Sequence, residues 1–154
     1  QRNPIVSMED LENAVPKMNG TDVFEFTIKQ VPALFEEYKI TFGKKLEQFD
    51  YIIMHQANLM MLKHIANKLN IPAEKMPISI HKYGNVSSAS VPIAIADLCE
   101  NLEVPKQELE LLISGFGVGL SLGILSIKLQ PKDVLPIVYS DYVWDEKFDE
   151  VCSE

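Results

Sequence analysis

The chain has 154 residues, of which 47% are hydrophobic and 23% charged, a balance typical of a globular domain and not of a disordered chain. It carries 14 lysines and arginines against 22 aspartates and glutamates, a formal net charge of −8. The lack of a basic cluster argues against nucleic-acid binding. No apolar run reaches the ~18 residues of a membrane-spanning helix, and no signal segment is visible, so we expect a cytoplasmic protein with no membrane contact.

The first residue, the two cysteines and the C-terminal segment are the next features of the sequence. The sequence begins at Gln1 rather than Met, which suggests a piece of a longer protein. Cys99 and Cys152 form neither a disulfide framework nor a CxxC site, so we expect two reduced thiols. Residues 131–154 hold seven acidic residues and two lysines, which makes this acidic segment a separate compositional zone.

The first predicted element is a helix. Residues 1–20 show no hydrophobic period, so we predict an irregular lead-in. A helix is predicted to start at Asp22, which forms a capping pair with Glu25. Its apolar stripe consists of Val23, Phe24, Phe26, Val31, Leu34, Phe35 and Tyr38. Pro32 should bend or break this helix.

The middle of the chain alternates predicted strands and helices. Residues 49–54 have the composition of a buried strand, and apolar residues at helical spacing follow over residues 59–69. Residues 77–81 predict a second strand. Gly84 and Asn85 predict a turn, and the serines of residues 87–90 offer N-caps for a helix that runs to about residue 101.

The last part of the chain predicts two adjacent strands. Residues 109–113 form the first, the glycines of residues 115–119 turn the chain, and residues 120–129 form the second. Strands that alternate with helices and end in an adjacent pair predict an α/β domain, in which a mixed sheet is layered with helices.

His55 is the strongest candidate for chemistry. It follows the first predicted strand directly, and α/β folds place functional groups at the carboxyl ends of strands. A histidine there can donate to a developing oxyanion or move a proton near neutral pH. The alternative is a histidine that only caps the strand end. His64, on the following helix, and His81, at the end of a predicted strand, are more consistent with structural or exposed positions.

Two further motifs are ambiguous when taken alone. Asn85 fits ordinary turn chemistry, although its amide could also donate to a carbonyl oxygen. The Gly-Phe-Gly-Val-Gly run of residues 115–119 is not a dinucleotide fingerprint, because a strand and not a helix is predicted to follow it. Its glycines instead favour a close approach of the backbone to a partner or substrate, with a free N–H.

Taken together, three segments resemble the second half of 3-oxoacyl-[acyl-carrier-protein] synthase III, a thiolase-like ketoacyl synthase. They are Asp-Tyr-Ile-Ile-Met-His-Gln-Ala-Asn at residues 50–58, Tyr-Gly-Asn-Val-Ser-Ser-Ala-Ser-Val-Pro at 83–92, and Gly-Phe-Gly-Val-Gly-Leu-Ser-Leu-Gly at 115–123. The resemblance implies a thiolase-like half-domain over residues 21–129. Residues 1–20 would lead in from a preceding half, and residues 130–154 would form an acidic C-terminal extension.

The resemblance implies a condensing enzyme of fatty acid initiation. In that family a Cys-His-Asn triad accepts an acyl group from acyl-CoA and joins it to malonyl-acyl carrier protein with loss of carbon dioxide. The matching residues here are His55 and Asn85, and Phe116 and Gly117 match the backbone loop at the oxyanion. A homodimer is implied, and we expect no metal and no cofactor.

The sequence also departs from the family pattern. The nucleophilic cysteine is implied to lie in a preceding half, and neither cysteine of this chain matches it, so the chain alone should be inactive. The implied carrier-protein contact comprises Gln56, Ala57, Asn58, Leu59, Met60, Lys63 and Lys68. Met60 stands where the family commonly has a basic residue, which should weaken the docking of an acidic carrier protein.

These departures leave a second function open. The chain could be a non-catalytic thiolase-like module that binds a carrier protein or pairs with a catalytic subunit, or a synthase of the same fold for a specialised acyl chain. The aromatics of the acidic segment, which are Tyr139, Tyr142, Trp144 and Phe148, belong either to a solvated extension or to one that packs on the domain. An isolated half should also expose an apolar face and self-associate.

Overall fold

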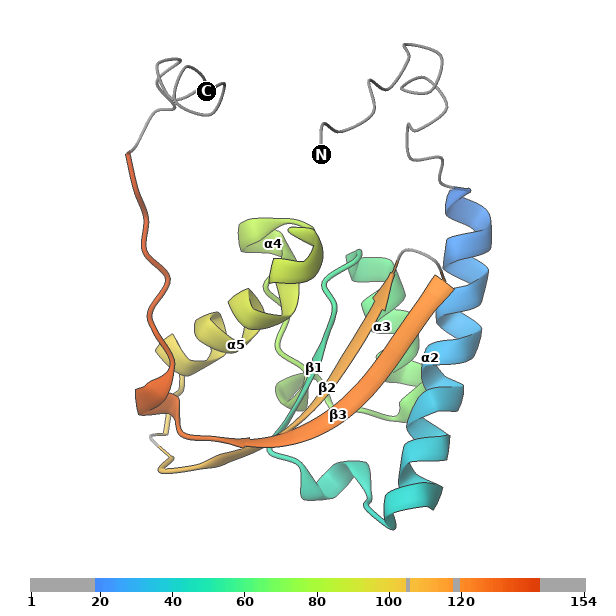
Figure 1. Ribbon diagram of the computed structural model, residues 1–154, viewed down its shortest axis with the longest axis horizontal. Coiled ribbons are helices and arrows are strands. Elements are labelled where there is room, and N and C mark those ends of the chain that lie inside the picture. Colours follow the sequence, from blue (N-terminus) through green and yellow to red (C-terminus); the bar gives the residue numbers. More distant parts are fainter. Residues whose placement is uncertain (1–18, 105, 118–119, 142–154) are drawn as a thin grey trace, which may run out of the picture.

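A three-stranded mixed sheet lies at the centre of the computed structural model, which describes residues 19–104, 106–117 and 120–141 (Figure 1). The sheet order is β1 (Tyr51–Met54), β2 (Leu109–Gly117) and β3 (Ser121–Leu129). β1 is parallel to β2, with Tyr51 opposite Leu111, and β2 is antiparallel to β3, with Leu109 opposite Leu129. The predicted α/β class, the mixed sheet and the closing strand pair are therefore confirmed.

Helices cover both faces of this sheet (Figure 1). α2 (Gly20–Phe42) and α3 (Leu59–Leu69) pack on one face, and α5 (Ser90–Glu100) packs on the other. The remaining helical pieces are α4 (Ile80–Tyr83) and the short 3-10 turns Leu46–Gln48, Ala73–Lys75, Ser87–Ala89 and Pro131–Asp133.

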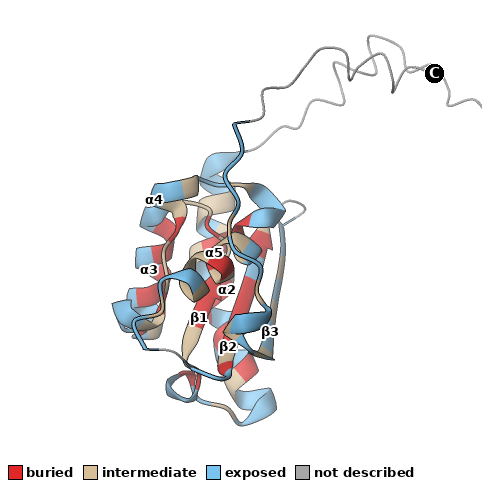
Figure 2. Ribbon diagram, turned by 90° about the vertical axis from the view of Figure 1, so that its left-hand side faces the viewer, coloured by how far each residue is buried: buried red, intermediate tan, exposed pale blue. Residues whose placement is uncertain are grey.

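The core lies in two layers, one on each side of β2. Successive side chains of a strand point to opposite faces. Leu112 and Phe116 therefore enter the layer under α2 and α3, while Leu109, Leu111 and Ile113 enter the layer under α5. In Figure 2 the buried positions follow the strands between the helices. β2 is thus the strand around which both layers are organised.

α2 begins two residues earlier than predicted and is not broken by proline. Asn19 caps it, because the Asn19 side chain accepts hydrogen bonds from the backbone N–H groups of Thr21 and Asp22, at 3.2 and 3.5 Å. Pro32 is buried inside the helix, and the expectation of a break is wrong. Burial of the flanking Val31 and Phe35 in the core outweighs the hydrogen bond that proline cannot donate.

Two further local predictions are wrong. Residues 77–81 form no strand, because Ser79 and Ile80 lead into the short helix α4, where His81 is exposed. The turn predicted at residues 115–119 begins later, since β2 stays paired with β3 as far as Gly117, which lies opposite Ser121.

No described helix is both long enough and apolar enough to cross a membrane.

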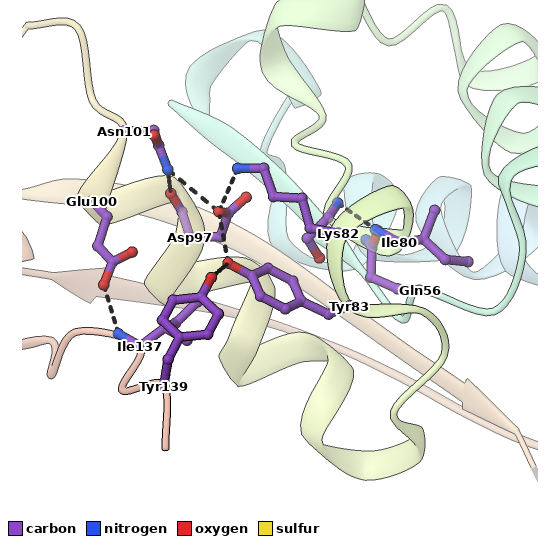
Figure 3. Close-up of polar contacts among 10 residues, drawn as sticks. Gln56, Ile80, Lys82, Tyr83, Asp97, Glu100, Asn101, Ile137 and Tyr139 are labelled. Carbon is purple, nitrogen blue, oxygen red and sulfur yellow. Dashed lines mark hydrogen bonds and ion pairs between the residues drawn. The ribbon is translucent and has the colours of Figure 1, made fainter. Parts of the chain in front are cut away.

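The start of the acidic C-terminal segment lies beside α5, as Figure 3 shows. The Ile137 N–H donates to the Glu100 carboxylate at 2.6 Å, and the Tyr139 hydroxyl lies 3.2 Å from the Tyr83 hydroxyl. Tyr83 in turn donates to Asp97 at 3.3 Å. This described part of the segment therefore makes polar contacts with the domain. Tyr142, Trp144, Phe148 and Cys152 lie outside the described residues, as does most of the lead-in over residues 1–20.

Exposed apolar side chains occur on β3 and on the segment after it. Leu125 of β3 is 51% exposed, and Leu135 and Val138 are more than four-fifths exposed. This distribution is compatible with the predicted self-association of an isolated half, which stays a prediction.

One buried hydroxyl predicts a stabilising substitution. Ser114 on β2 is fully buried, and its Oγ has no hydrogen-bond partner in the described structure. A buried unsatisfied polar group typically costs about 1–3 kcal/mol. We expect Ser114→Ala to leave the free energy of unfolding unchanged or to raise it by about 1 kcal/mol, measured by urea unfolding. A loss above about 1 kcal/mol would mean that the hydroxyl does have a partner.

Candidate active site

His55 lies where β1 ends and is held from three sides. Its backbone N–H donates to the Ser114 carbonyl at 2.9 Å, which continues the pairing of β1 with β2. Its ring Nδ1 lies 2.5 Å from the Ser90 Oγ at the start of α5. The Phe116 ring stands almost perpendicular to the imidazole, with 5.3 Å between the ring centroids. The position of this ring is therefore set by β2, which supplies Ser114 and Phe116, and by α5, which supplies Ser90.

Partial burial favours the neutral form of His55. Partial burial lowers the pKa of the imidazole below its ordinary value, because the charged form loses hydration. Among the described residues, no hydrogen bond involves the second ring nitrogen, Nε2. The site therefore offers an imidazole with one nitrogen that has no hydrogen-bond partner among the described residues.

Asn85 lies in a tight turn beside the His55 segment. Gly84 precedes it at φ +71°, a conformation that favours glycine, and Ser87 follows at φ +53°. The Asn85 Oδ1 accepts the Ser87 N–H at 3.0 Å, which supports this turn. Its Nδ2 donates to the Ala57 carbonyl at 3.4 Å, a long hydrogen bond that leaves the second N–H of the amide available.

These contacts bring the predicted catalytic residues into one cluster. Asn85 donates to the carbonyl of Ala57, which lies two residues after His55. His55 in turn contacts Ser90, which lies five residues after Asn85. Phe116 borders the same imidazole from β2. Gly117 ends β2, and a Cβ added there would meet no atom within 4 Å. No packing contact in the described residues therefore requires glycine at that position.

The expected carrier-protein residues divide into buried and exposed groups. The Gln56 side chain is 1% exposed; it donates to the Met54 carbonyl at 2.8 Å and accepts the Ser79 and Ile80 N–H groups, the latter contact drawn in Figure 3. These internal hydrogen bonds hold the Gln56 side chain inside the domain, and the expected carrier-protein contact of this stretch stays a prediction. Asn58 caps α3 by accepting the Met61 N–H at 2.8 Å.

The remaining members of that group are accessible to different extents. Leu59 and Met60 in the first turn of α3 are 39% and 66% exposed, and Lys63 and Lys68 are exposed further along the helix. Ala57 is half-buried. A partner that approaches α3 would therefore meet Leu59, Met60 and the two lysines.

Cys99 does not have the environment of a nucleophile. It lies near the end of α5 and packs against the core layer beneath that helix. Burial raises the pKa of its thiol, which lowers the fraction of reactive thiolate at neutral pH. No hydrogen bond of the described structure joins it to His55 or Asn85.

Comparison with known families identifies this arrangement. Residues 41–129 match the family model described as 3-oxoacyl-[acyl-carrier-protein (ACP)] synthase III C terminal, and the matched range contains His55, Asn85 and Phe116. The chain belongs to the 3-oxoacyl-[acyl-carrier-protein] synthase III family. The match covers more than half of the chain and ends at the last residue of β3.

Curated members of the synthase III family are similar over most of this chain. It is 40% identical over 120 residues to β-ketoacyl-[acyl-carrier-protein] synthase III of Clostridium tetani, which covers 78% of this chain and 36% of the relative. The relative of Streptococcus mutans is 34% identical over 128 residues, which covers 82% of this chain and 39% of the relative. The chain therefore spans less than two-fifths of the length of these synthases.

Solved structures support the same fold. The 3-oxoacyl-(acyl-carrier protein) synthase of Burkholderia xenovorans superposes with a TM-score of 0.67 at 34% identity, over 83% of this chain and 38% of that chain. A priming β-ketosynthase of the R1128 polyketide pathway superposes with a TM-score of 0.69 at 27% identity, over 82% of this chain and 40% of that chain. The half-domain is thus thiolase-like, as predicted.

Sequence reasoning missed the contact between Ser90 and His55. The serines of residues 87–90 were interpreted as N-caps, whereas Ser90 is the first residue of α5 and is 1% exposed. Two features of the sequence could have indicated a buried hydroxyl close to the site. Ser90 belongs to the segment that resembles the synthase III pattern, and it precedes Ala94 of the core by four residues, which is one helical turn.

Proposed function

We propose that this chain supplies the histidine and asparagine of a β-ketoacyl-acyl carrier protein synthase III, an acyltransferase of fatty acid initiation. The observation that carries the proposal is the cluster of His55, Asn85 and Phe116 at the carboxyl end of β1. The substrates of the whole enzyme would be acyl-CoA and malonyl-acyl carrier protein. A homodimer in the cytoplasm is part of the proposal.

In this proposal the two side chains stabilise a developing negative charge. When the malonyl group loses carbon dioxide, the electron pair of the broken bond moves toward the thioester carbonyl, whose oxygen becomes negative. His55 Nε2 and the second N–H of the Asn85 amide are two neutral donors that the described structure leaves available. Donors fixed in advance at such an oxygen act mainly on the transition state.

The nucleophile would come from another part of the enzyme. Cys99 is partly buried against the core and its thiol has a raised pKa, so it is unsuited to accept an acyl group. The family match begins only at residue 41, and the relatives are more than twice as long as the matched part. We propose that the cysteine lies in the portion of the enzyme that corresponds to the unmatched part of these relatives, and that the chain alone does not condense.

A chimeric enzyme tests this proposal. The portion of the Clostridium tetani synthase III that precedes its matched region would be joined to this chain, and formation of the 3-oxoacyl product from acyl-CoA and malonyl-carrier protein would be measured. We expect product from the chimera and none from the chain alone or from the preceding portion alone. A chimera that folds and binds malonyl-carrier protein without forming product would contradict the proposal.

We also propose that α3 contributes to carrier-protein docking. Lys63 and Lys68 are exposed on this helix and carry the sign of charge that an acidic carrier protein would meet. Met60 is exposed in the first turn, so a charge at this position would face the same partner.

Exposure of Met60 gives a measurable consequence. We expect Met60→Arg to tighten the binding of acyl carrier protein by about two- to fivefold, mainly through a faster association rate, with the gain decreasing at high salt. The measurement is surface plasmon resonance at two ionic strengths. Lys29→Arg, an exposed exchange on α2 that keeps its charge, is the control and should change nothing. If Met60→Arg leaves the affinity for acyl carrier protein unchanged, this face of α3 does not take part in the proposed contact.

The exposed Met60 also favours a second candidate function. A non-catalytic thiolase-like module would bind a carrier protein or a catalytic subunit and would need no optimised catalytic contact. It predicts that the chimera binds malonyl-carrier protein but releases no carbon dioxide from it. The two functions are therefore separated by carbon dioxide release and not by binding. A synthase for a specialised acyl chain would instead show product only with that acyl-CoA.

A further inference from the structure

The side chain of Ser90 has an unusually constrained set of hydrogen-bond partners. It is 1% exposed at the start of α5. Its Oγ lies 2.5 Å from His55 Nδ1, and it also accepts the backbone N–H of Gln56 at 3.3 Å. The same hydroxyl therefore touches both the imidazole and the backbone of the residue after it.

The number of donors and acceptors decides the direction of the short hydrogen bond. A serine hydroxyl has one hydrogen to donate and two lone pairs that accept. One lone pair is used by the Gln56 N–H, and among the described contacts of Ser90 only His55 Nδ1 can accept the hydroxyl hydrogen. If Nδ1 carried a hydrogen and donated it, the buried hydroxyl hydrogen would lose its acceptor, which is costly inside a protein.

We infer that Ser90 is a positioning residue that donates to His55 Nδ1 and thereby holds the imidazole in the tautomer with its hydrogen on Nε2. This inference rests on the proposed function for its catalytic meaning. An unprotonated Nδ1 leaves the single ring hydrogen on Nε2, to which no described residue is hydrogen-bonded. That nitrogen is then a donor toward a substrate oxygen without any need for a positive charge.

Phe116 complements this role without replacing it. Its ring limits the tilt of the imidazole through a perpendicular contact, but a ring contact does not distinguish a histidine from its flipped or tautomeric form. Ser90 makes the polar contact that does distinguish them. A hydrogen bond to the second nitrogen is a general way to orient a histidine. At metal-binding histidines the loss of such a partner typically costs about 10–100-fold in affinity or activity, and we expect a loss of the same order here.

Nitrogen NMR of the whole 154-residue chain tests the tautomer directly. With ¹⁵N-labelled histidine at a pH where the rings are neutral, we expect His55 Nδ1 to give the shift of an unprotonated, hydrogen-bonded nitrogen and Nε2 that of a protonated one. Assignment uses the loss of one signal set in His55→Ala. The reverse pattern in the unmodified chain would overturn the inference, and this measurement needs no Ser90 variant to fold.

Substitutions then test the role of the hydroxyl. In Ser90→Ala we expect the Nδ1 signal to move toward that of a nitrogen without a hydrogen bond, and Ser90→Thr, which keeps a hydroxyl, should restore it. Ser88→Ala, in an exposed serine of the same segment, is the matched control and should leave the signal unchanged. An unchanged Nδ1 shift in a folded Ser90→Ala chain would contradict the inference.

The catalytic meaning has its own measurement. In the chimeric enzyme, Ser90→Ala should lower kcat for carbon dioxide release by about 10–100-fold with little change in KM for malonyl-carrier protein. A change in KM with an unaltered kcat would contradict the positioning role. If the chimera releases no carbon dioxide at all while the NMR pattern is as expected, the proposed function fails and the structural role of Ser90 stands.

Discussion

His55→Ala is expected to lower the rate of carbon dioxide release from malonyl-carrier protein in the chimeric enzyme by about 10²–10³-fold, the usual loss when one oxyanion donor is removed. Both kcat and kcat/KM should fall together, because the interaction is made mainly in the transition state. The alanine also removes the contacts to Ser90 and Phe116, so a circular dichroism spectrum and a thermal unfolding curve must accompany the rates.

A second histidine of the chain provides the control. His64 lies exposed on α3, and its side chain makes no hydrogen bond to the described residues, so His64→Ala should leave kcat at saturating carrier protein unchanged. Equal losses in the two variants would indicate a general effect on the chimera. A loss below about threefold in His55→Ala would remove His55 from the proposed stabilisation of the oxyanion.

Phe35→Ala is expected to lower the free energy of unfolding by about 3–5 kcal/mol. Phe35 is fully buried on α2 and belongs to the core layer that contains Leu112 and Phe116 of β2. Removing the ring leaves a cavity in that layer in addition to the lost transfer free energy. Because Phe35 precedes the matched family region, the measurement also tests whether α2 is part of the same cooperative domain.

The same helix contains the matched control. Phe42 is 64% exposed near the end of α2, although its ring centroid lies 4.7 Å from that of Tyr38. We expect Phe42→Ala to cost about 0.5–1.5 kcal/mol in urea unfolding, the range of an aromatic pair. Similar losses for Phe35→Ala and Phe42→Ala would mean that α2 is not anchored in the core through Phe35.

Elements with one clear hydrophobic period were predicted well from the sequence. The helix predicted over residues 59–69 has the observed bounds, because its apolar positions recur at helical spacing and Asn70, in a left-handed conformation, ends it. The two last strands were found for a similar reason, since residues 109–113 and 120–129 are rich in β-branched and other apolar residues.

Elements that depend on distant partners were predicted poorly. Residues 77–81 have the composition of a strand, but Gln56 accepts the N–H groups of Ser79 and Ile80 and directs the chain into α4. Pro32 is tolerated in α2 because its neighbours pack on the sheet. Neither effect can be read from local propensity, since both arise from contacts between segments that are far apart in the sequence.

The candidate site shows the same division. The motifs identified His55 and Asn85, because residue type and order are visible in a sequence. They did not show that Gln56 is buried as a structural amide or that Ser90 contacts the imidazole. Those two facts depend on how the chain packs in space, because the residues that follow β1 contact residues 79, 80 and 90, which are distant in the sequence.

In the proposed reaction, His55 and Asn85 donate together to one oxygen of the substrate. The most direct measurement is a crystal structure of the chimeric enzyme with a malonyl-thioester analogue that cannot lose carbon dioxide. The proposal predicts the thioester carbonyl oxygen within about 2.7–3.2 Å of both His55 Nε2 and Asn85 Nδ2. An analogue bound in the site with that oxygen hydrogen-bonded to neither side chain would contradict it.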